Sequence, residues 1–85
     1  MIQSNTRTST NQFIGDYTFA PDEDICVVAR PFSADVVGVD TSTLRIKYSA
    51  RTGRQPLEVC ALGNRQVIAC DWKTGDLLQG ELRST

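Results

Sequence analysis

The sequence predicts an all-β fold, either a small barrel or a small sandwich, of five to six antiparallel strands. Three segments carry this prediction: an alternating strand over residues 43–49, a hairpin turn at Gly63-Asn64 and a second tight turn at Gly75. Short apolar segments that are separated by turn residues at regular spacing are typical of such folds. With 85 residues, the chain has room for one core and not for two.

The first residues differ in composition from the rest of the chain. Residues 1–12 are polar and rich in Ser, Thr and Asn, so we expect a flexible N-terminal tail followed by a single β domain over residues 13–85. The tail has no apolar signal core, and no apolar run approaches the roughly 20 residues that a membrane span needs. We therefore expect a cytoplasmic protein that does not enter a membrane.

Two strands are expected in the first part of the domain. Tyr17 and Phe19 alternate with polar residues and predict a short strand, and residues 21–24 (Pro-Asp-Glu-Asp) predict a solvated turn. Residues 25–29 are apolar on both faces of any strand, which predicts a central strand. Pro31 ends this strand, because proline cannot donate a hydrogen bond to a paired ladder.

Residues 33–39 leave two alternatives open. Their valines favour a strand, while Ser33 followed by Ala-Asp could begin a short helical turn near residues 33–38. Beyond them, the side chain of Asp40 is expected to cap a turn.

The strand over residues 43–49 is the clearest in the chain. Its side chains alternate between apolar and polar, so one face points to the core and the other to solvent. We expect Leu44, Ile46 and Tyr48 on the core side, with Arg45 and Lys47 outside.

The next two strands form a hairpin. The two-residue connection Gly63-Asn64 suits a primed turn, and in that register the numbers of opposite residues sum to 127. Cys60 and Cys70 then lie on opposite faces, so they are not expected to bridge each other. The core-facing side chains are expected to be Leu57, Val59, Ala61, Ile68 and Cys70, continued by Trp72.

A last strand completes the predicted sheet. Residues 73–76 form a turn in which Gly75 can take the left-handed conformation. Residues 77–82 return as a strand, and Gly80 within it indicates a bulge or a close approach of another backbone. Taken together, these elements predict an SH3/Sm-like or OB-like barrel, with a small sandwich as the alternative.

The charge is unevenly distributed along the chain, although the net charge is only −1. Residues 16–40 contain six acids and one base and sum to −5, whereas residues 45–65 contain five bases and one acid and sum to +4. An acidic face and a basic face would serve partner recognition. The alternative is that the two stretches interleave in space and form an ordinary solvated surface.

A basic group is the sharpest local feature. Arg45 and Lys47 share the outer face of one strand, and Arg51 and Arg54 lie in the turn that leaves it. We predict that these four residues bind an anion or a partner, since arginine offers paired donors to phosphate and carboxylate. Tyr48 points inward and cannot act as a stacking platform, which weakens a single-stranded nucleic-acid interpretation.

The chain lacks residues that several kinds of catalytic and metal site require. The chain has no histidine and three cysteines, Cys26, Cys60 and Cys70, which we expect to be free thiols. A histidine-assisted nucleophile and a mixed Cys/His zinc site cannot be built, and no phosphate-binding glycine loop or credible acid/base pair is present. We therefore expect a protein that is not an enzyme and that holds no metal or cofactor.

The second half of the chain resembles a shortened WYL-type domain. The similar segments are residues 46–49 with Thr52-Gly53, residues 67–71, and residues 74–77 with Leu82. That family has a Sm/SH3-like barrel and occurs in bacterial ligand-responsive regulators. Its Trp-Tyr-Leu triad would fall on residues 65–67 (Arg-Gln-Val) and its last-strand arginines on Leu78 and Glu81, so the resemblance implies the barrel and carries no ligand site over.

The leading functional hypothesis is a small binding module, regulatory or accessory, of bacterial or phage type. It would engage a protein partner or an anionic ligand. Two alternatives stay open: a nucleic-acid-binding protein that uses the basic face, and a structural subunit that is completed by homodimerisation or by docking through a sheet edge.

Overall fold

The computed structural model describes residues 14–85, and these form an all-β protein, as predicted. The predicted tail over residues 1–12 and the start of the predicted domain at residue 13 lie outside the described residues. The strands are β1 (Asp16–Phe19), β2 (Ile25–Arg30), β3 (Asp35–Asp40), β4 (Arg45–Arg51), β5 (Pro56–Gly63), β6 (Gln66–Asp71), β7 (Leu77–Glu81) and β8 (Arg83–Ser84).

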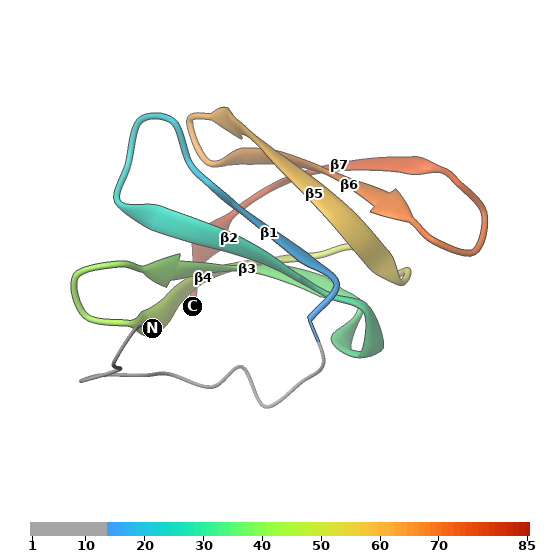
Figure 1. Ribbon diagram of the computed structural model, residues 1–85, viewed down its shortest axis with the longest axis horizontal. Helices are drawn as coiled ribbons and strands as arrows, with labels where there is room; N and C mark the ends of the chain where they lie inside the picture. Colours follow the sequence, from blue (N-terminus) through green and yellow to red (C-terminus); the bar gives the residue numbers. More distant parts are fainter. Residues whose placement is uncertain (1–13) are drawn as a thin grey trace, which may run out of the picture.

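These eight strands form two antiparallel sheets, more strands than the five to six predicted. One sheet has the order β1-β2-β3-β4-β8 and the other has the order β5-β6-β7 (Figure 1). The chain returns to the five-stranded sheet at Leu82, a buried residue that follows β7 and precedes β8 in the sequence. Within the described part of the chain no ladder pairs β1 with β5, so hydrogen bonds do not close the two sheets into a barrel.

The ambiguous segment after β2 divides into a short helix and a strand. Pro31 begins a 3-10 helix, η1 (Pro31–Ser33), because its fixed φ suits a first helical position and its missing N–H is not needed there. Ala34 then takes a left-handed conformation with a φ of 55°, and β3 follows. The helical turn therefore comes earlier than residues 33–38, and the valines of that segment form the strand.

The main core lies between the two sheets. Its buried side chains are mostly small and aliphatic, and Val27 and Val36 are fully buried in it. A second, smaller cluster of Val28, Val37 and Val39 is buried on the opposite face of the five-stranded sheet, as side-chain alternation along β2 and β3 requires. No helix among residues 14–85 is long and apolar enough to cross a membrane.

A β-bulge interrupts the alternation of side chains that the sequence predicts for β4. Val39 pairs with Ile46 and Gly38 pairs with Tyr48, which leaves Lys47 as the extra residue. Ile46 therefore packs on the second cluster, whereas Tyr48 packs on the main core. Leu44, also predicted inward, precedes the strand in a turn with a φ of 58°.

The β5–β6 hairpin has a register that differs by one residue from the prediction. Its turn residues are Asn64-Arg65, and Cys60 pairs with Ile68 where Val67 was expected. Because a one-residue slip exchanges the two faces, β6 buries Val67 and Ala69 and leaves Ile68 half-buried on the other side.

The slip also changes the environment of the cysteines and of Trp72. Cys60 and Cys70 lie on the same face of the sheet, with Cys60 exposed and Cys70 half-buried, and both are free thiols. Trp72, predicted to continue the core, is 52% exposed. Val59 is buried as predicted.

Two predicted turns are confirmed. The Asp40 carboxylate accepts hydrogen bonds from the backbone N–H groups of Ser42 and Thr43 at 2.8 and 3.1 Å. Gly75 takes the left-handed conformation with a φ of 76°.

Candidate functional site

The structure distributes the four predicted basic residues over the length of β4 and the loop that follows. Arg45 lies opposite Asp40 at the start of the strand, and Arg51 ends it. At about 3.3 Å per residue the two arginines are about 20 Å apart along the strand. One phosphate or carboxylate group cannot contact both of them.

Two of the four cations are already paired with carboxylates. Lys47 Nζ lies 3.1 Å from Asp40 Oδ2. Arg54 Nη1 lies 3.4 Å from Asp76 Oδ2 and 3.8 Å from Oδ2 of the buried Asp71. The basic and acidic stretches of the sequence therefore interleave in space at these points.

Arg45 and Arg51 are the other two of the four predicted basic residues. Neither forms an ion pair with another residue in the described range 14–85. Asp35, the residue opposite Arg51, is held by Arg30 through two hydrogen bonds of 2.8 and 2.7 Å. These bonds raise the pKa of Arg30, and they occupy the carboxylate that lies opposite Arg51.

Arg51 stands at the rim of a slot with an apolar floor, which we call the β4–β7 slot. The slot has a volume of about 250 Å³, and its walls are residues 50–52 and residues 77–80. Its floor consists of the core side chains Val36, Val67 and Ala69. Leu77, at one end of the wall, is 74% exposed.

The two walls of this slot are not joined to each other. In the described part of the chain, β4 pairs with β3 and β8, β7 pairs with β6, and no backbone hydrogen bond connects β4 with β7. Where a strand has a neighbour on one side only, every second residue leaves its N–H and C=O unpaired on the other. The slot therefore offers apolar contacts, backbone hydrogen-bonding groups and Arg51, a cation with no ion-pair partner within residues 14–85.

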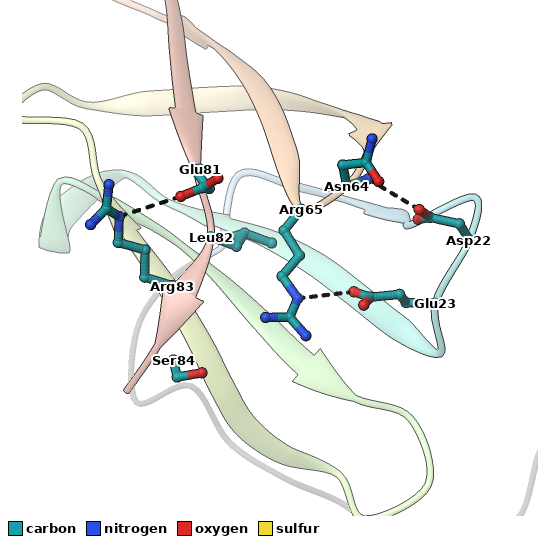
Figure 2. Close-up of a pocket in the computed structure, with 8 residues that line it drawn as sticks. All are labelled: Asp22, Glu23, Asn64, Arg65, Glu81, Leu82, Arg83 and Ser84. Atoms are coloured by element: carbon teal, nitrogen blue, oxygen red, sulfur yellow. Dashed lines mark hydrogen bonds and ion pairs between the residues drawn. The ribbon is translucent and has the colours of Figure 1, made fainter.

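A second hollow lies where three connections meet, and we call it the Arg65 hollow. Its volume is about 570 Å³ (Figure 2). The lining residues come from the β1–β2 loop, the β5–β6 turn and the β7–β8 connection: Asp22, Glu23, Asn64, Arg65, Glu81, Leu82, Arg83 and Ser84.

The β1–β2 loop, predicted as a merely solvated turn, is docked on the β5–β6 turn. Asp22 Oδ2 accepts a hydrogen bond from the Asn64 backbone N–H at 3.1 Å, and Glu23 Oε2 lies 3.3 Å from Arg65 Nε. The Arg65 carbonyl in turn accepts a hydrogen bond of 2.8 Å from the Leu82 N–H. The turn is thus held from two sides.

Arg65 has an unusual backbone and a fixed side chain. Its φ is 61°, in the left-handed region that few residues other than glycine adopt. The guanidinium carbon lies 4.3 Å from the centre of the Tyr48 ring, and the hydrogen bond with Glu23 raises the pKa of Arg65. The sequence carried one signal for this site: arginine follows Asn64 in a hairpin turn, where Asn-Gly is the common pair.

The described residues give no sign of a metal centre. No three His, Cys, Asp or Glu side chains between residues 14 and 85 are grouped so that they could hold an ion.

The chain was compared with models of protein families, with curated proteins and with solved structures, and none of the three comparisons finds a match. The chemistry of the slot and of the hollow is therefore the guide to function.

Proposed function

We propose that this protein is a small non-enzymatic binding module, regulatory or accessory in role, that engages a protein partner at the β4–β7 slot. One observation is the main support for this proposal. Arg51 has no ion-pair partner among the described residues, and it borders a slot with an apolar floor between two strand edges that are not joined. Of the four basic residues singled out in the sequence, it alone lines that slot.

The slot selects for a particular chemistry in its partner. Its floor suits an apolar side chain, because burying apolar surface is favourable. Arg51 suits an acidic residue beside that side chain, since a guanidinium can bind a carboxylate through two parallel hydrogen bonds. The open edges of β4 and β7 suit an extended peptide, whose backbone can pair where a small apolar molecule cannot.

Nucleic-acid binding is less well supported. A phosphate backbone is bound by several free cations at once, whereas Lys47 and Arg54 are occupied by carboxylates. Completion of the protein by a second copy of the chain would use the same open edge as the peptide, and a measurement of the solution mass separates the two.

The test is a selection from a random-peptide display library on the immobilised protein. We expect enriched peptides to share an apolar residue next to Asp or Glu. For a selected peptide, Arg51→Glu should weaken binding at least tenfold, and Leu77→Ala should weaken it by a smaller factor. Two matched controls, Arg45→Glu on the same strand and Leu62→Ala on the β5–β6 hairpin, should bind within about twofold of the wild type.

Two results would oppose the proposal. One is equal sensitivity to Arg45→Glu and Arg51→Glu, which would indicate general charge attraction in place of a slot. The other is a solution mass of two chains that falls to one chain in Leu77→Ala, which would assign the open edge to a second copy.

A further inference from the structure

We infer that the Arg65 hollow is a second binding site, and that it takes a carboxylate group on the terminal nitrogens of Arg65. This inference does not rest on the proposed function, because the hollow and the β4–β7 slot share no lining residue. It rests on the position of one guanidinium, on its unused donors and on the backbone conformation that presents it.

The guanidinium is oriented before any ligand arrives. Its Nε is hydrogen-bonded to Glu23 at 3.3 Å, and its carbon lies 4.3 Å from the centre of the Tyr48 ring. Figure 2 shows the contact with Glu23 leaving from Nε, and it marks no contact at either terminal nitrogen with the other residues drawn. Little side-chain freedom is left to lose on binding, and this loss is a main cost of binding through arginine.

The terminal nitrogens of Arg65 remain available. They have no hydrogen-bond or ion-pair partner among residues 14–85. Two coplanar N–H groups match the two oxygens of a carboxylate. The Ser84 side chain, which also lines the hollow, offers a hydroxyl as a further donor.

The charges around the hollow favour a carboxylate over a phosphate. Its acidic lining residues are Asp22, Glu23 and Glu81, and its basic ones are Arg65 and Arg83, which gives a sum of −1. Glu81 already accepts a hydrogen bond of 3.1 Å from Gln66 and lies 3.6 Å from Arg83. A ligand with one negative charge meets less repulsion in this setting than one with two.

The backbone points to the same residue. Asn64 and Arg65 both have positive φ values, 52° and 61°. Asparagine tolerates this conformation, whereas arginine is strained in it and glycine would be relaxed. A two-residue primed turn requires a positive φ at both of its central residues, so Arg65 occupies a position where glycine would cost less.

The experiment is a titration of the ¹⁵N-labelled protein with sodium acetate at constant ionic strength, followed by NMR. We expect saturable shifts of the Arg65 Nε–H signal and of the Ser84 amide. Arg65→Gly should abolish them while its urea unfolding midpoint stays at or above that of the wild type, since glycine suits the positive φ. Ala34→Gly relaxes a residue of positive φ (55°) outside the hollow and should bind acetate within about twofold of the wild type.

Three further arms define the ligand. Arg65→Lys keeps the charge and removes the paired donors, so we expect it to bind acetate at least fivefold more weakly. N-acetyl-triglycine, compared with its C-terminal amide, tests a peptide terminus. Binding tighter than that of acetate assigns the hollow to a chain end, and binding equal to that of acetate assigns it to a small acid.

Two results would overturn the inference. One is acetate binding by Arg65→Gly within twofold of the wild type, and the other is tighter binding of inorganic phosphate than of acetate.

Discussion

The carboxylate of Asp16 accepts a hydrogen bond from the backbone N–H of Val59 at 3.2 Å. Asp16 begins β1, at one edge of the five-stranded sheet, and Val59 lies in β5, at one edge of the three-stranded sheet. No strand ladder joins these edges within residues 14–85. A side chain therefore connects the two sheets where the backbone does not.

This contact predicts a specific loss of stability. Asp16→Ala leaves the Val59 N–H without its acceptor and should lower the free energy of unfolding by about 1–3 kcal/mol. Asp16→Asn keeps an acceptor oxygen and should lose less. Urea denaturation of the three proteins measures the difference. If the alanine variant is as stable as the wild type, the contact does not hold the sheets together.

Two glycines should differ in how much stability the protein loses when each is replaced by alanine. A Cβ at Gly15 would lie 2.6 Å from the Leu57 carbonyl oxygen and 3.0 Å from its Cα, both parts of a backbone that cannot easily move. Gly15→Ala should therefore cost about 1–3 kcal/mol of unfolding free energy. A Cβ at Gly80 would meet only the Ala50 Cβ, at 3.6 Å, so Gly80→Ala should be nearly neutral. Thermal unfolding distinguishes the pair, and equal losses would contradict this packing.

Asp40 should contribute to the dependence of stability on pH. Its hydrogen bond with Lys47, followed by those from the Thr43 and Ser42 N–H groups, holds its pKa below the ordinary value of 3.8. Because the folded pKa is the lower one, the stabilisation is fully present above the unfolded pKa and is lost as the pH falls through the folded pKa.

The matched variant is Asp40→Asn, which retains an oxygen to accept the two backbone N–H groups. The melting temperatures of wild type and variant should differ most above the ordinary pKa of 3.8 and converge as the pH falls below it. A difference that stays constant across this range would show that the charge of Asp40 does not stabilise the fold.

The three thiols should be alkylated at different rates. Cys60 is exposed and Cys70 is half-buried. Burial raises the pKa of the Cys26 thiol, which lowers its thiolate fraction at neutral pH. With iodoacetamide at pH 7.5 and peptide mass mapping, we expect Cys60 to react first and Cys26 last, and the order should disappear in urea. Early modification of Cys26 would contradict its burial.

The sequence was sufficient for the fold class and for several turns. Alternation predicted a strand where β4 lies, although not its bulge, and turn residues predicted the Asp40 cap and the left-handed Gly75. Each of these features depends on residues close together in the chain. The hairpin register was not determined in this way. Gly63-Asn64 and Asn64-Arg65 are both acceptable two-residue turns, and the choice between them depends on which face of β6 meets the other sheet.

The surroundings of the four predicted basic residues could be read from the sequence only in part, for a related reason. Spacing placed Arg45 and Lys47 outside, and both are exposed, yet it could not show that Asp40 and Asp76 would neutralise Lys47 and Arg54. Those ion pairs depend on how separate strands and loops lie in space. The Tyr48–Arg65 contact could not be predicted from the sequence for the same reason, since it joins β4 to a turn of the other sheet.

The central claim is that a protein partner occupies the β4–β7 slot beside Arg51, and amide chemical-shift mapping with a selected peptide tests it most directly. We expect the largest shifts to cluster at residues 50–52 and 77–80, to disappear in Arg51→Glu and to persist in Arg45→Glu. Shifts centred on Tyr17 and Phe19, which are 59% and 62% exposed on β1, would place the partner elsewhere and contradict the claim.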